Sequence, residues 1–67
     1  MATKRHEITE DQLDLADRLM RELMDEGVTN SMALEIQTKS YLRVLYGYST
    51  QHADQIVNTL LTVSEGV

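Results

Sequence analysis

Apolar and polar positions follow a helical spacing in three successive segments of this 67-residue chain. In the first segment, from residue 10 to about 26, and in the third, from about 50 to 63, apolar residues recur every three or four positions. The second segment, about residues 30–46, is apolar around more than half of its circumference. The spacing predicts an all-α fold, in which a helix-turn-helix is followed by a third helix.

These apolar positions are the candidate core. In the first segment they are Leu13, Ala16, Met20, Leu23 and Met24, with Leu15 and Leu19 widening the stripe. In the third they are Ala53, Ile56, Val57, Leu60 and Leu61. In the second they are Ala33, Leu34, Ile36, Tyr41, Leu42, Val44, Leu45 and Tyr46. A helix that is buried on one side needs an apolar stripe of about 100°. The wider stripe of the second helix therefore predicts two buried sides, one of them covered in a homodimeric helical bundle.

Local residues predict where the helices begin and end. Thr9 and Gln12 have the spacing of a capping box at the start of the first helix. Gly27 and Gly47 have the position of left-handed residues that end the first and second helices. The cap of the second helix is left open among Thr29, Asn30 and Ser31, and that of the third between Ser49 and Thr50.

Length and charge narrow the class of protein. The chain forms one domain, residues 1–67, in which residues 1–8 are expected to be a flexible N-terminal arm. Since it has no cysteine, no disulfide can stabilise so small a core, and a second subunit is the stabiliser that remains. No apolar run approaches the roughly 18 residues of a membrane span, which predicts a cytoplasmic protein that binds no membrane. The net charge of −5 suits a basic protein partner or simple solubility, and disfavours nucleic acid.

No group of residues has the arrangement of a catalytic or cofactor site. Ser49, His52 and Asp54 are of the types found in a nucleophilic relay, but residues 52 and 54 point to different sides of a helix. The two histidines, His6 and His52, do not have the spacing of a metal site. We therefore expect no enzymatic activity, no metal and no cofactor.

An acidic face is predicted on the first helix, formed by Asp14, Asp17 and Asp25. Arg18 and Arg21 lie four residues from these carboxylates, which indicates exposed ion pairs rather than acid–base chemistry. Such a face would steer a basic partner toward the protein.

The candidate interface lies where the second helix turns into the third. Tyr41, Leu45 and Tyr48 are predicted to form one face there, because tyrosine is enriched in protein interfaces; core positions are the alternative for them. Lys39 and Arg43 form a basic patch on the second helix, either solvated or in contact with the acidic face of the first helix in the same or another subunit. These residues favour a non-enzymatic module that regulates or inhibits a partner protein by binding it.

The charged residues suggest two other functions. In a small DNA-binding transcriptional regulator, Lys4 and Arg5 of the arm would act together with the third helix. That helix has neither lysine nor arginine, although phosphate contacts usually dominate the affinity. Alternatively, the carboxylates of the first helix would imitate DNA in front of a nucleic-acid enzyme.

Residues 8–43 resemble the small, uncharacterised bacterial YoaH-type proteins. The shared features are Ile8-Thr9, Gln12, Ala16, Glu22-Leu23-Met24 with Gly27, Ala33-Leu34 and Leu42-Arg43. The third helix departs from that family, which has a polar tail there. The resemblance implies a small helical protein of bacterial or phage type, and it implies no activity.

Overall fold

The predicted all-α, three-helix fold is confirmed. The computed structural model describes residues 7–65, and the side chains of residues 7–63. Its helices are α1 (Glu10–Asp25), α2 (Ser31–Tyr46) and α3 (Thr50–Glu65), and the described part of the chain contains no strand. The arm proposed for residues 1–8 lies for the most part outside the described residues.

The start of each helix is set by a side chain that accepts backbone hydrogen bonds. Thr9 and Gln12 form the predicted capping box of α1: the Gln12 N–H donates to Thr9 Oγ1 (3.2 Å), and the Thr9 N–H donates to Gln12 Oε1 (3.1 Å). Of the open alternatives, Asn30 caps α2, since its Oδ1 accepts from two N–H groups of the first turn. Ser49 caps α3 by accepting from the His52 N–H (3.1 Å).

The two glycine turns differ, although the sequence predicts the same arrangement for both. Gly27 (φ 104°) lies in a Schellman motif: the Val28 N–H donates to the Leu23 carbonyl, and the Gly27 N–H donates to Met24. Gly47 (φ 76°) also adopts the left-handed conformation. There, however, the N–H groups of both Gly47 and Tyr48 donate to the carbonyl of Leu42.

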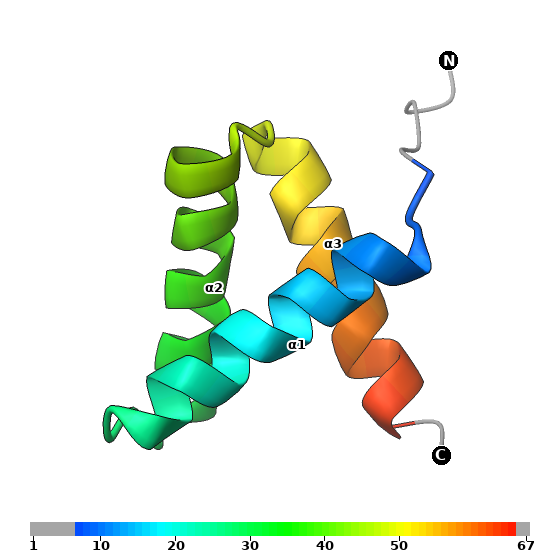
Figure 1. The fold of residues 1–67 in the computed structure, drawn as a ribbon. Coiled ribbons are helices and arrows are strands. Elements are labelled where there is room, and N and C mark those ends of the chain that lie inside the picture. Colours follow the sequence, from blue (N-terminus) through cyan, green and yellow to red (C-terminus); the bar gives the residue numbers. More distant parts are fainter. Residues whose placement is uncertain (1–6, 66–67) are drawn as a thin grey trace.

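The helices are arranged like a capital A (Figure 1). α2 and α3 are joined at the top and diverge downward, and α1 lies across them as the crossbar. Each helix contacts both others. The core lies where they meet and consists of Ala16, Leu19, Met20, Leu42, Ala53, Ile56 and Val57. α1 lies close to the N-terminal half of α2 and away from its C-terminal half (Figure 1).

The core side chains come unequally from the helices. α1 buries four residues, Ala16, Leu19, Met20 and Leu23. Of its predicted stripe, Leu13 is half-buried, and Met24 is exposed rather than part of the core. α2 buries only Thr38 and Leu42, although it has the widest apolar surface of the three helices in sequence. Within this chain α2 therefore has one narrow buried side; Ala33 and Leu34 are half-buried, and its other apolar residues are exposed.

Candidate functional site

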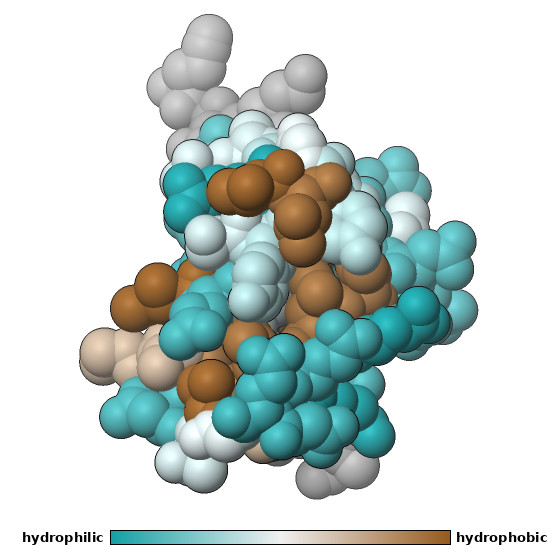
Figure 2. Space-filling view, turned by 60° about the vertical axis from the view of Figure 1, so that its left-hand side comes forward, coloured by the Kyte–Doolittle hydropathy of each residue, from teal (hydrophilic) through white to brown (hydrophobic). Residues whose placement is uncertain are grey.

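The main surface feature of the protein is a set of exposed apolar side chains on α2. Among residues 7–63, eight large apolar side chains are exposed, and six of them belong to this one helix. These six are distributed around the helix, and we call them together the α2 face: Met32, Ile36, Tyr41, Val44, Leu45 and Tyr46. Figure 2 looks toward the side of the molecule that carries α2, and shows apolar side chains reaching the surface among hydrophilic ones.

The structure separates the three residues that were predicted to form one interface. Tyr41 and Leu45 are on the α2 face and are 37% and 63% exposed. Tyr48 is half-buried and packs against the core. Its ring meets the imidazole of His52 edge-on, with ring centroids 4.9 Å apart. Of the two alternatives, core and interface, the core applies to Tyr48, whereas Tyr41 and Leu45 lie on the surface.

Met32, Ile36 and Val44 are exposed residues that the predicted interface did not contain. They occupy positions 32, 36 and 44, so they share one row of side chains along the helix, spaced in multiples of four. Ser40 occupies the fourth position of this row. The row could have been identified from its position relative to Leu42. Ser40 and Val44 lie two residues before and after the buried Leu42, and residues two apart point to nearly opposite sides of a helix.

Lys39 is turned toward α3. Its Nζ lies 3.1 Å from Glu35 Oε1 and 3.6 Å from Asp54 Oδ1. The side chain is 22% exposed, so this lysine ties α2 to α3 at the edge of the core. Within this chain, the alternative that Lys39 meets the acidic face of the first helix is wrong. Arg43 is exposed and has no ion pair with any described residue.

The acidic face of α1 is only partly paired. Arg21 Nε donates to Asp17 Oδ2 at 2.9 Å. Asp14 and Asp25 are exposed and form no ion pair with any residue from 7 to 63. Of the exposed ion pairs expected on this face, one is present among the described residues, which leaves its negative charge largely uncompensated.

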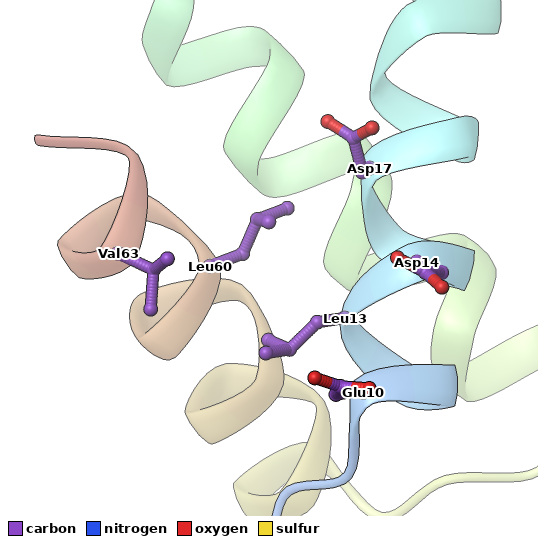
Figure 3. Close-up of a pocket in the computed structure, with 6 residues that line it drawn as sticks. All are labelled: Glu10, Leu13, Asp14, Asp17, Leu60 and Val63. Atoms are coloured by element: carbon purple, nitrogen blue, oxygen red, sulfur yellow. The ribbon is translucent and has the colours of Figure 1, made fainter. Parts of the chain in front are cut away.

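A shallow cleft lies between this face and α3. It has a volume of about 400 Å³ and is lined by Glu10, Leu13, Asp14, Asp17, Leu60 and Val63. Leu13 of α1 and Leu60 of α3 extend toward each other, and the carboxylates lie on the α1 side (Figure 3). Asp25 does not line the cleft. The cleft combines an apolar floor with a negative rim, and it contains no histidine or hydroxyl that could act on a substrate.

The trio of Ser49, His52 and Asp54 does not form a relay. The hydroxyl of Ser49 caps α3, and the ring of His52 packs on Tyr48. The carboxylate of Asp54 faces Lys39. Each side chain has a structural contact of its own: Ser49 is the one of the two open candidates that caps α3, and Asp54 is in an ion pair.

Comparison with known proteins adds no relative. Neither a family model, nor a curated protein, nor a solved structure matches this chain. The resemblance of residues 8–43 to the YoaH-type proteins stays a prediction from sequence.

The described residues also bear on metal binding, membrane insertion and DNA binding. No three histidine, aspartate or glutamate side chains there come together in a way that could hold a metal ion. None of the described helices combines the length and the apolar character that crossing a membrane requires. Lys4, Arg5 and His6, which the DNA-binding hypothesis needs, lie outside the described residues.

Proposed function

We propose that this chain is a non-enzymatic protein-interaction module, a small regulator or inhibitor that binds a partner protein through the α2 face. The observation that carries the proposal is the concentration of six exposed large apolar side chains on one helix. Clustered apolar surface of this kind marks interaction sites, because covering it releases about 25 cal/mol for each Å² removed from water.

The residue types on the C-terminal half of α2 suit recognition. Tyr41 and Tyr46 combine a large apolar body with a polar tip, and Arg43 lies exposed between them in sequence. Tyrosine and arginine are enriched among the few residues that carry most of the binding energy in interfaces. α1 lies away from the C-terminal half of α2, so a partner can reach this half (Figure 1).

Charge favours a protein over a nucleic acid as the partner. α3 has no lysine and no arginine among its 16 residues. α1 has six carboxylates and two arginines, a net charge of −4. An acidic surface repels phosphate and raises the rate at which a basic protein approaches. We place this activity in the cytoplasm, and the absence of cysteine fits such a reducing compartment.

A capture experiment with matched variants tests the proposal. Tagged wild-type protein, Tyr41→Glu and Leu45→Glu would be used to capture proteins from the native cell extract, with Met24→Glu as the control. Met24 is an exposed apolar residue (49%) on α1, so it matches the chemistry of the change but not its place. Glutamate is chosen because it keeps a good helix propensity.

We expect a protein that wild type and Met24→Glu retain and that both α2 variants lose, while all four keep the same helical circular dichroism. If the captured proteins are the same for all four, the α2 face is not the recognition surface. If Met24→Glu alone loses the partner, the interface belongs to α1.

A further inference from the structure

One row of side chains runs along the outward side of α2. It consists of Met32, Ile36, Ser40 and Val44, spaced four residues apart, and we call it the α2 ridge. Its three apolar members are 69%, 59% and 75% exposed in that order. The ridge lies opposite the buried side of the helix, because Ser40 precedes the fully buried Leu42 by two residues, or about 200° around the helix.

We propose that the α2 ridge packs against the same ridge of a second copy of this chain, so that two α2 helices cross at Ser40 around a twofold axis. The inference rests on the proposed function, since it names one protein that the α2 face binds. Tyr41 and Leu45 lie to one side of the ridge and stay available to another protein.

The spacing of the ridge fits the commonest way in which two helices pack. Rows of residues four apart interdigitate when helices cross at about −50°, with their axes 8–10 Å apart. A small residue at the crossing point permits the close approach, and Ser40 is the small residue in the middle of this row. A contact between identical surfaces closes after two copies, so it gives a dimer and not a filament.

The antiparallel orientation keeps like charges apart. Around an axis at Ser40, an antiparallel pair places Ile36 opposite Val44 of the partner subunit. It places Arg43 opposite Gln37 of the partner subunit, whose amide oxygen can accept a hydrogen bond from the guanidinium. In a parallel pair, each Arg43 would instead lie next to Arg43 of the partner subunit.

The distribution of charge selects this face for a second copy. Each copy has a net charge of −5, so two copies repel each other through most of their surfaces. α2 is the exception: with one glutamate, one lysine and one arginine it has a net charge of +1. Its single carboxylate, Glu35, is already paired with Lys39. A second acidic copy therefore meets least repulsion at α2.

A stable dimer would cover a sizeable share of the surface of so small a chain. A standard interface covers about 800 Å² on each partner. This is roughly one sixth of the 4967 Å² surface of the chain. Small domains without cross-links usually gain stability from such a second subunit.

Cross-linking through an introduced cysteine tests the geometry directly. The natural chain has no cysteine, so Ser40→Cys creates a single thiol. Helices whose axes are 8–10 Å apart bring facing Cα atoms to within about 5 Å, which is inside the range of a disulfide. We expect Ser40→Cys to form a disulfide-linked dimer on mild oxidation at low micromolar concentration, and the exposed control Met24→Cys to remain mostly monomeric.

Sedimentation equilibrium of the full chain supplies the second measurement. We expect a dimer mass for wild type, and for Ile36→Glu and Val44→Glu a dissociation constant raised by more than about 100-fold, because each charge enters the interface twice. Met24→Glu should leave the constant within about threefold of wild type. Unchanged circular dichroism would show that the variants are folded.

The outcomes separate this inference from the proposed function. A wild type that is monomeric up to millimolar concentration, or equal cross-linking of Ser40→Cys and Met24→Cys, overturns the ridge dimer. If a partner is nevertheless captured through Tyr41 and Leu45, the proposed function stands without the dimer. A dimer that only Met24→Glu dissociates would place the interface on α1 and overturn the inference as well.

Discussion

α1 and α2 have the same length, 16 residues each, and they use their apolar residues in opposite ways. α1 has a charged side and an apolar side, and it buries four residues in the core. α2 is apolar in most directions but buries two. The apolar side of α1 is largely covered within the chain, whereas α2 leaves most of its large apolar side chains exposed. A helix with more apolar residues is thus not the helix that contributes more to the core.

The sharpest test of this comparison uses two leucines three residues apart on α2. Leu42 is fully buried and Leu45 is 63% exposed. We expect Leu42→Ala to lower the free energy of unfolding by about 2–5 kcal/mol, because it leaves a cavity in the core. Leu45→Ala should change it by less than about 0.5 kcal/mol. Urea unfolding, at a protein concentration too low for any dimer to form, measures both free energies of unfolding. Similar losses for the two variants would mean that α2 lies differently against the core.

The buried side of α2 also contains a polar atom without a partner. Thr38 is fully buried, and its Oγ1 has no hydrogen bond to any described residue. We expect Thr38→Val to raise the free energy of unfolding by about 1–2 kcal/mol, because valine keeps the shape and removes the desolvated hydroxyl. Thermal unfolding would show the gain as a higher Tm. A loss of stability on this change would indicate that the hydroxyl is hydrogen-bonded.

The ends of the two helices allow a smaller comparison. Gly27 and Gly47 both have positive φ, and a Cβ added at either would meet no atom within 4 Å. The cost of Gly27→Ala and of Gly47→Ala is therefore backbone strain alone, about 1 kcal/mol each. Chemical denaturation of the two variants should give similar losses. A much larger loss for Gly47→Ala would show that the turn between α2 and α3 depends on more than its dihedral angle.

The smallest expected effect compares two ion pairs. Asp54 faces the half-buried Lys39 between two helices, and Asp17 faces the exposed Arg21 along α1. Both carboxylates are nearly half exposed, so solvent screens both pairs. We expect Asp17→Asn to change stability by about 0.3 kcal/mol and Asp54→Asn by somewhat more, up to about 1 kcal/mol. Repeating the measurement in high salt should reduce both differences.

Local features of the fold could be predicted from sequence, and long-range ones could not. The capping box of Thr9 and Gln12 and the turn at Gly27 depend on residues within one helical turn, so the sequence contains the whole signal. The direction of Lys39 depends on Asp54, fifteen residues away on another helix. Nothing in the spacing of α2 alone indicates which of its neighbours that lysine meets.

The candidate surface shows the same division. The width of the apolar stripe on α2 is visible in sequence, but which part of it is covered depends on how α1 crosses. Because α1 lies away from the C-terminal half of α2, Tyr41 and Leu45 are exposed (Figure 1). Tyr48, which the sequence grouped with them, follows the glycine turn and packs against the core instead. The crossing of helices is a property of the whole core and is not encoded at any single position.

The oxidation of methionine side chains can report which surfaces of this protein are exposed. Met20 is buried in the core, Met24 is exposed on α1, and Met32 is exposed at one end of the α2 ridge. Peroxide converts accessible methionine to its sulfoxide, each adding one oxygen that peptide mass spectrometry locates. In an isolated chain, Met24 and Met32 should be oxidised at comparable rates and Met20 far more slowly. In the ridge dimer Met32 alone should become protected with rising protein concentration, so that the unlabelled natural chain reports its own assembly.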